Sequence, residues 1–299
     1  MHFTTIGAAI VDIVVSHVQP MRGAKQDVDH IGLYAGGGAV NAALNVAALG
    51  AQVTVHACVG RDLEGGLIRD LLQRHGIRAA ISDHTLPTGK AVVMVDDAGA
   101  ARAYAQRGAS AWVGGQGFAG LSQADVVYVT GLSLESQAWL QDALADMTAR
   151  PFRLVVTPGA RQLSDPAALH GLWDQADLLC VNANEAAKLG GGNALQTDAP
   201  PPDVAQALAR RLIRRQGQSI LVTLGSGGAL FFDGEQGHFH AARTVPAVST
   251  IGAGDAFASA FVHAWADGAS PQAALSAATD SAARIIQIVP ANQAGPLRA

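Results

Sequence analysis

The sequence predicts an α/β protein in which helices cover both faces of a central, mostly parallel sheet. Short apolar runs alternate with longer stretches of helical periodicity through most of the 299 residues, which is the pattern of successive strand–helix units. Hydrophobic residues make up 49% of the chain and charged residues 15%. A chain of this length and composition can bury a large core as one domain.

The first third of the chain begins with this alternation and then interrupts it. We expect strands at 3–15 and 53–59, and helices at 38–50 and 63–75. Gly50 and Gly76 stand where glycine commonly ends a helix. Residues 91–95 and 101–105 are predicted as a hairpin with Gly99 in its turn. A hairpin at this point indicates a small β lid, contributed by about 13–35 and 88–111.

The alternation resumes after the hairpin and continues to the end. Expected strands are 126–130, 154–157, 178–181, 220–224 and 229–232, with a further β-like run at 238–248. Expected helices are 134–148, 184–189, 204–216, 253–267 and 271–289. The segment 190–203, rich in proline and glycine, is expected as a surface loop. We find no internal repeat and no long linker, so 1–299 is predicted to be a single catalytic domain.

Composition excludes several classes of function. A net charge of −4 provides no excess of positive charge for binding nucleic acid or an acidic membrane. No apolar run approaches the length of about 18 residues that a membrane span needs. The N-terminus lacks a basic stretch before its apolar run and is interpreted as the first strand, not as a signal peptide. Cys58 and Cys180 stand singly in apolar runs, which predicts buried thiols and a cytoplasmic protein.

The strongest chemical signal is the stretch S-T-I-G-A-G-D-A-F at 249–257. It follows a β-like run and opens a helix. Gly252, Ala253 and Gly254 can bring several backbone N–H groups together at the helix N-terminus, where the helix dipole also favours an anion. A carboxylate directly after an anion seat is unusual unless it accepts a proton, so Asp255 is our first candidate for a base. The alternative is a plain helix start with an acidic residue that compensates the dipole.

Two features near the N-terminus suit a hydroxylated ligand. Asp12, just beyond the G-A-A-I-V of the first strand, can accept hydrogen bonds from sugar hydroxyls, although a polar strand end is an equal alternative. The glycines at 36–38 allow close approach of the backbone, and Asn41 in the first helical turn can donate and accept at once. A flexible helix entry with a surface asparagine is the other interpretation.

Two further features follow strands in the second half. Asn182 and Glu185 lie one helical turn apart in N-A-N-E, so they can hold hydrated Mg2+ near phosphate oxygens; helix capping by Asn182 or Asn184 explains the same residues. T-L-G-S-G-G at 223–228 either passes beneath a nucleotide or forms a tight hairpin. Ligands of open α/β sheets bind at the carboxyl ends of strands, so all these features are expected in one crevice.

Phosphoryl transfer requires N–H groups for the developing charge, a metal on the phosphates and a carboxylate for the acceptor hydroxyl. The chain offers all three. At this point its motifs identify a resemblance: G-G-G-A-V-N-A-A, N-x-x-E, T-L-G-S and G-A-G-D-A-F, in this order, resemble the ribokinase-like, or PfkB, carbohydrate kinases over nearly the whole length.

The resemblance implies a ribokinase-like three-layer fold, ATP and Mg2+ as cosubstrate and cofactor, and transfer to a hydroxymethyl group of a small sugar or nucleoside. It also implies a homodimer formed through the lid. The residues that it assigns are Asp255 as base with Gly252, Ala253 and Gly254 as the anion hole; Asp12, Gly37, Gly38 and Asn41 at the acceptor; Asn182, Thr223, Gly225 and Gly228 at the nucleotide; and Glu185 at Mg2+, through water.

One departure and one ambiguity concern cation and substrate. Many members of the family have an aspartate where this chain has Ser249, which puts the usual monovalent cation site in doubt. Three features look like the pseudouridine kinase branch, our first expectation. They are Ser249, the motif G-A-A-I-V-D followed by G-G-G-A-V-N, and the tail P-A-N-Q-A-G-P. Y-A-Q-R-G-A-S-A at 104–111 is instead similar to fructokinases and 2-keto-3-deoxygluconate kinases, in which Arg107 meets the substrate; a solvated lid charge is the other interpretation of Arg107. Tyr34 and Trp112 are the nearest candidates to stack on a base.

The sequence argues against two functions of other classes. A non-catalytic sugar- or nucleotide-binding regulator is disfavoured because Asp255, Asn182 and Glu185 are all retained. A dinucleotide-dependent dehydrogenase is disfavoured because no G-x-G-x-x-G follows the first strand with an acidic residue about 20 positions on.

Overall fold

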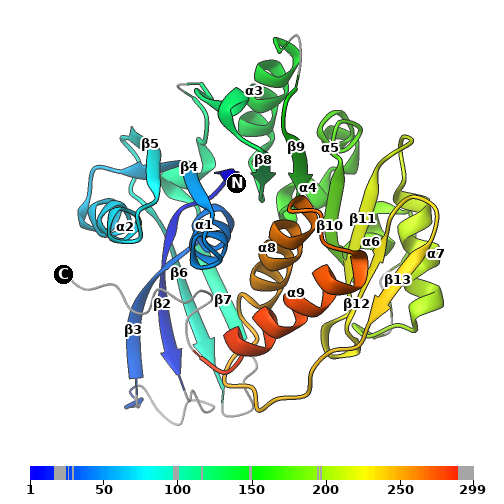
Figure 1. Cartoon of the computed structure of the whole chain (residues 1–299). Coiled ribbons are helices and arrows are strands. Elements are labelled where there is room, and N and C mark those ends of the chain that lie inside the picture. Colours follow the sequence, from blue (N-terminus) through cyan, green and yellow to red (C-terminus); the bar gives the residue numbers. More distant parts are fainter. Residues whose placement is uncertain are drawn as a thin grey trace.

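The computed structural model describes residues 1–16, 25, 27–28, 30–96, 101–115, 117–147, 150–193, 195 and 197–288. Within them the chain forms two sheets (Figure 1). The large sheet has the strand order β13-β12-β11-β10-β9-β8-β1-β4-β5, and the small sheet has the order β3-β2-β6-β7. The predicted α/β architecture with a small β lid is confirmed.

The large sheet is parallel except at one edge. Its parallel strands are β1 (His2–Ile6), β4 (Gln52–Gly60), β5 (Arg78–His84), β8 (Val126–Val129), β9 (Arg153–Val156), β10 (Leu178–Asn182) and β11 (Ser219–Thr223). The antiparallel edge consists of β12 (Ala229–Phe232) and β13 (Gly237–His240). Except for the edge strand β5, the parallel strands are mostly buried, because helices cover both of their faces.

Helices form a layer on each side of the large sheet. One side carries α1 (Gly38–Ala48), α2 (Leu63–Arg74), α8 (Ala253–Ala266) and α9 (Pro271–Ile285). The other carries α3 (Leu134–Ala145), α4 (Ala160–Ser164), α5 (Pro166–Trp173), α6 (Ala183–Leu189) and α7 (Pro202–Leu212). Side chains of β8 alternate between the two cores: Val126 and Tyr128 pack on the first side, and Val127 and Val129 on the second.

The small sheet stands beside the large one in Figure 1. It consists of β2 (Ile10–Ser16), β3 (His30–Gly36), β6 (Gly89–Val95) and β7 (Ala101–Gln106). The predicted hairpin is confirmed, because β6 and β7 pair antiparallel. Its turn with Gly99, and most of the polar segment 19–31, lie outside the described residues.

Several expected boundaries are wrong. The single strand expected at 3–15 is two strands in different sheets, because the chain turns at Gly7 (φ 152°). The β-like run 238–248 is a strand only to His240. The helix expected at 204–216 ends at Leu212, where the Arg214 N–H donates to the side-chain oxygen of Gln218 (2.8 Å) instead of continuing the helix.

Two compositional expectations can also be compared with the structure. Cys58 and Cys180 are both buried and unpaired, as expected. No helix in the described part of the chain combines the length and apolar character needed to cross a membrane.

Candidate active site

The candidate site lies at the edge of the large sheet where its parallel strands end. Strands β10 and β11 end there at Asn182 and Thr223, and the first turn of α1 packs beside Thr130, which follows β8. The first turn of α8 reaches the same place. This is the edge at which open α/β sheets bind their ligands.

Asp255 is joined directly to Asn41. The Asn41 side-chain amide donates to the Asp255 carboxylate at 2.9 Å across 214 positions of sequence. Each residue stands in the first turn of its helix, Asn41 in α1 and Asp255 in α8, and the two helices pack together. The structure thus combines two residues that the sequence assigned to different parts of the site.

The start of α8 has the form expected of an anion seat. Gly252 precedes the helix with φ 76°, a left-handed conformation that favours glycine. The Ala253 N–H donates to the Thr250 carbonyl (3.3 Å). The N–H groups of Gly254 and Asp255 belong to the first helical turn, where no carbonyl of the helix is available to them. These groups and the dipole of a 14-residue helix favour negative charge at this point.

Two carboxylates, Asp255 and Asp12, lie within electrostatic reach of each other at the site. Burial raises the pKa of Asp255, and the hydrogen bond from Asn41 offsets part of the rise. Burial and the nearby charge of Asp255 raise the pKa of Asp12 to about 6. Asp12 lies in β2 of the small sheet and Asp255 in α8, so the lid and a helix of the large layer contribute one acidic group each.

The glycines at 36–38 have a steric role. A Cβ on Gly36 would overlap the Asp12 carboxylate, and a Cβ on Gly37, which has φ 90°, would overlap the Ala8 carbonyl. A Cβ on Gly38 would meet the side chain of Thr130. The glycines therefore let the entry to α1 pass close to Asp12, which places Asn41 beside the crevice.

Asn182 and Glu185 form a capping box at the start of α6. The Asn182 side chain accepts from the Glu185 N–H, and the Glu185 carboxylate accepts from the Asn182 N–H, both at 2.9 Å. Capping by Asn182 is therefore the correct interpretation of these contacts, and Asn184 instead donates to Asp198 and accepts from the Leu195 N–H.

Glu185 also lies within electrostatic reach of the candidate base Asp255. Burial raises the pKa of Glu185, and so does the charge of Asp255. Acidic groups within electrostatic reach of each other fit a site for a cation. Within the described part of the chain, no group of three or more His, Cys, Asp or Glu side chains can hold a metal by itself. Mg2+ suits such a site, since it keeps waters and uses one or two carboxylates with substrate phosphates.

A cavity of about 460 Å³ lies beside the start of α8. Thr223, Gly225 and Gly228, which the sequence assigned to the nucleotide, line it together with Ala253 and Gly254. The glycines form a tight turn between antiparallel strands as well, so the hairpin interpretation of 223–228 is confirmed and the nucleotide contact stays a prediction. The volume lies in the usual range for a small-molecule site.

Sequence reasoning missed most of the other walls of this cavity. They come from the irregular segment after β13 and from one face of α9: Ala242, Arg243, Thr244, Val245, Ala247, Thr279, Ala282, Ala283 and Ile286. Small residues on α9 leave room for a ligand. No local signal marks the segment 241–248, which was expected to continue as a strand.

Arg107 lies at the rim of a separate small cavity and has a partner there that the sequence did not suggest. Arg107 and Arg161 line it together with backbone of Gly131 and Gly159; both arginines are exposed. Arg161 follows β9 in T-P-G-A-R, a glycine-bearing strand-to-helix junction of the same kind as the four that were recognised. That pattern was the signal available for finding it.

The two aromatic candidates are engaged elsewhere. Tyr34 is 4% exposed, and its hydroxyl lies 3.1 Å from the His30 ring. Trp112 stacks on His84 with ring centres 5.3 Å apart and also contacts Trp139. Ser249 is buried, and its hydroxyl accepts from the Ile251 N–H at 3.2 Å.

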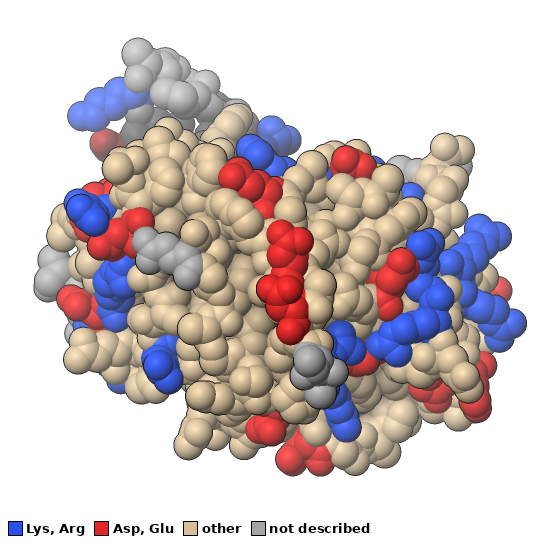
Figure 2. All heavy atoms as spheres, turned by 90° about the horizontal axis from the view of Figure 1, so that it is seen from above, with Lys and Arg blue, Asp and Glu red and all other residues tan. Residues whose placement is uncertain are grey.

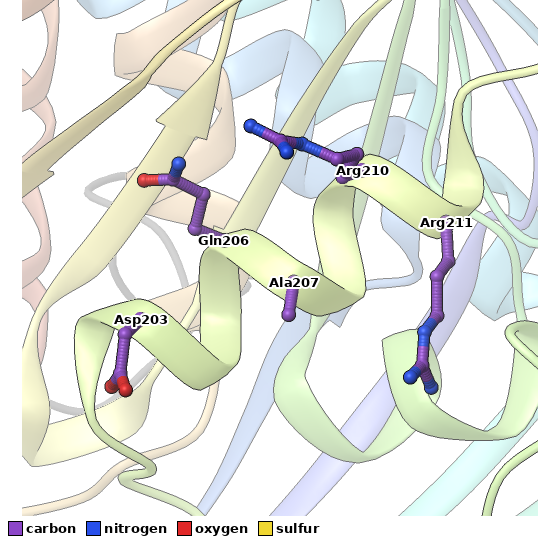
Figure 3. A pocket seen from close by; sticks show the side chains of 5 residues that line it. All are labelled: Asp203, Gln206, Ala207, Arg210 and Arg211. Atoms are coloured by element: carbon purple, nitrogen blue, oxygen red, sulfur yellow. The ribbon is translucent and has the colours of Figure 1, made fainter.

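Basic side chains gather away from this site, at the end of the molecule where α7 lies (Figure 2). A surface hollow there is lined by five residues of one helix: Asp203, Gln206, Ala207, Arg210 and Arg211 (Figure 3). Arg214 and Arg215, which follow α7, pair with Asp174 and Asp177. Arg210 and Arg211 thus form a solvated helix face, and Arg214 and Arg215 form structural ion pairs.

The fold and the site together define a ribokinase-like α/β protein with a buried acidic residue beside a nucleotide-sized cavity. The family model described as pfkB family carbohydrate kinase matches residues 2–293. The chain belongs to this family.

Individual relatives agree with this assignment. The chain is 36% identical over 90 residues to fructoselysine 6-kinase of Shigella flexneri, a match that covers 30% of this chain and 34% of that protein. It is 29% identical over 298 residues to ribokinase of Arabidopsis thaliana, covering 95% and 75% of the two chains. The solved ribokinase of Cryptococcus neoformans in complex with ADP has a TM-score of 0.77 at 23% identity, covering 99% and 96%.

Proposed function

We propose that this protein is an ATP-dependent kinase that phosphorylates a hydroxymethyl group of a small sugar or nucleoside. One observation carries the proposal: Asp255 is held by Asn41 at the N-terminus of a helix whose first turn also lines a nucleotide-sized cavity. Acceptor base, anion seat and nucleotide space thus meet within one turn of α8. The resemblance of the family and the ADP complex of the Cryptococcus ribokinase support ATP as the donor.

In the proposed mechanism the residues of the site position the acceptor and the moving phosphoryl group. Asn41 and Asp12 hold hydroxyls of the acceptor, and Asp255 orients the reacting hydroxyl and takes its proton. A pKa raised by burial makes Asp255 a better base near neutral pH than an exposed aspartate. N–H groups of the first turn of α8 stabilise the charge that develops during transfer. Mg2+, held through water by Glu185, would neutralise phosphate oxygens.

Replacement of Asp255 tests the proposal. Asp255→Asn should leave ATP binding nearly intact and lower turnover about a hundredfold or more, the range for loss of a general base. Asp267→Asn is the matched control, because Asp267 is an exposed aspartate at the other end of the same helix. Undiminished turnover of the Asp255 variant would contradict the assignment, and the absence of ATP consumption with every acceptor would favour a non-catalytic binding protein.

For the acceptor, the arginine pair favours a ketose or keto-sugar acid over pseudouridine, our first expectation. Arg107 and Arg161 line one cavity and suit a carboxylate or a polar ketose end. Tyr34 is buried, and the Trp112 ring already stacks on His84. ATP consumption with pseudouridine, uridine, ribose, fructose and 2-keto-3-deoxygluconate separates the alternatives. Repeating the assay with and without K+ tests the role of Ser249.

We also propose that the protein is a homodimer through its lid. Leu33, Ile13, Val92 and Tyr104 are consecutive partners across the four strands of the small sheet, so they form one row on one face. Three of them are well exposed: Leu33 42%, Val92 40% and Tyr104 70%. An exposed apolar row of this kind marks an interaction surface.

The unpaired buried cysteines support the expected cytoplasmic location.

A further inference from the structure

A group of buried polar atoms lies behind the catalytic edge. Of the buried side-chain nitrogen and oxygen atoms that have no hydrogen-bond partner in the described structure, four belong to Thr5, Asn45 and Ser259. These side chains are 0%, 4% and 0% exposed. An unpaired buried polar group is costly and rare in native proteins, so several in one place require an explanation.

Helix geometry places two of these residues directly behind the candidate base. Asn45 follows Asn41 by one turn in α1, and Ser259 follows Asp255 by one turn in α8, so each pair shares a helix face. The Asn41–Asp255 hydrogen bond joins the first turns. Asn45 and Ser259 therefore occupy the corresponding places one turn further in, provided that the helices run in the same direction.

Both helices do run from the catalytic edge toward the opposite edge of the sheet. The end of α8 approaches the start of β1, because the ring of His263 stacks on Phe3 at 6.0 Å. The end of α1 leads to Gln52 at the start of β4, whose N–H donates to the Met1 carbonyl at 3.1 Å. The two helices thus run in the same direction and pack together, so we expect their second turns to face each other as their first turns do.

The sheet contributes two further polar groups beneath these turns. Thr5 faces the same side of β1 as Phe3, which contacts α8, and it is paired with Tyr128 of β8. The Tyr128 hydroxyl accepts from Thr157 at 3.3 Å. The hydroxyl of Ser259 also lies near the Tyr128 hydroxyl. Burial raises the pKa of Tyr128, and Ser259 offsets part of that rise. The two hydroxyls do not meet the geometry of a hydrogen bond. Thr5, Asn45, Tyr128 and Ser259 form what we call the inner polar cluster.

We propose that the inner polar cluster binds buried water that joins Asn45 to Ser259 and Thr5, and that Asn45 and Ser259 are thereby positioning residues for Asp255. An amide and two hydroxyls provide the donors and acceptors that a buried water uses, typically about three hydrogen bonds. The water forms a second link between α1 and α8, one turn behind the direct Asn41–Asp255 link. This inference rests on the proposed function of Asp255.

The second link matters because the reacting carboxylate depends on the register of two helices. A single hydrogen bond between first turns allows the helices to pivot about it. A second connection one turn away removes that freedom, so the Asp255 oxygens keep one orientation toward the acceptor. Displacement of a catalytic group by about 1 Å lowers rates by up to about a hundredfold.

Three variants test the positioning role: Asn45→Leu, Ser259→Ala and the double variant. Each single variant should lower kcat about tenfold with KM for ATP unchanged, since the nucleotide cavity is not altered. The double variant should lose no more than either single one, because both residues hold the same water. Its thermal midpoint should exceed that of the single variants, since it leaves fewer polar groups unpaired. Ser281→Ala, in a buried position of α9 outside the cluster, is the control.

Unchanged kcat in both single variants, or losses that multiply in the double variant, would overturn the proposal. A second measurement does not depend on activity: a high-resolution crystal structure of the unmodified chain should show ordered water in contact with Asn45 and Ser259. A dry contact between them would overturn the water site even if the protein is a kinase. Ordered water in a protein that consumes no ATP would instead contradict the proposed function. If Asn45→Leu does not fold, Ser259→Ala and the crystal structure decide.

Discussion

Replacing Asp12 by asparagine should stabilise the protein, and should do so only above a defined pH. Burial and the charge of Asp255 raise the pKa of Asp12 from 3.8 to about 6. The folded chain therefore keeps a proton between about pH 4 and pH 6 that the unfolded chain has already released. The free energy of unfolding falls as pH rises through this window, because the folded state binds more protons there than the unfolded state.

The size of the effect follows from the same shift. A difference of about two pKa units corresponds to about 3 kcal/mol at 1.36 kcal/mol per unit. Partial solvation of Asp12 lowers this figure, so we expect a gain of about 1–3 kcal/mol for Asp12→Asn at pH 7–8. Below about pH 4 both forms are neutral, and the two proteins should differ little. The ionised Asp12 carboxylate, which is proposed to bind hydroxyls of the acceptor, thus lowers the free energy of unfolding.

Urea unfolding of both proteins from pH 4 to pH 8 measures this difference. The gap between variant and unmodified protein should open through pH 4–6 and then stay constant. Asp70→Asn is the matched control, because Asp70 is exposed on α2 and meets solvent whether or not the chain is folded. A gap that is the same at every pH would refute the assumption that Asp12 is ionised at a cost. The variant should also raise KM for the acceptor, since Asp12 is proposed to hold it.

Two further predictions concern the acceptor and the lid. Arg161→Ala and Arg107→Ala should each raise KM for an acidic acceptor at least about tenfold while KM for ATP stays constant, because the loss of a charged hydrogen bond costs about 1.5–3 kcal/mol; equal KM values for all acceptors would remove the pair from the substrate site. Val92→Lys together with Tyr104→Lys should convert the expected dimer into monomers in size-exclusion chromatography with light scattering, with Tyr104→Phe as the control. An unmodified chain that is already monomeric would contradict the lid contact.

Much of the candidate site could be predicted because its residues stand in local motifs. Gly252 is needed for the left-handed turn before α8, and Gly37 for the passage by Ala8. Such requirements depend on a few neighbouring residues, so they leave a readable pattern in the chain. Asn182 illustrates the limit of prediction from local motifs. The sequence N-A-N-E is compatible with a helix cap and with a position beside a metal site, and only the geometry of α6 shows the capping contacts.

Contacts between distant segments leave no such pattern. The nucleotide-sized cavity needs the irregular segment 241–250 and the small residues of α9. Arg161 joins Arg107 only because the end of the lid comes to lie beside the junction after β9. Asn45 and Ser259 look like ordinary helix positions until α1 is packed against α8.

The sequence by itself determined the α/β class, most of the elements and the motif that contains Asp255, because periodicity, turns and caps are properties of neighbouring residues. Only the tertiary structure decided that Asn41 donates to Asp255 across 214 positions, that burial and the charge of Asp255 raise the pKa of Asp12, and that one strand became two at Gly7. These features depend on burial and on distance in space, and a chain acquires both only when its helices and strands have packed.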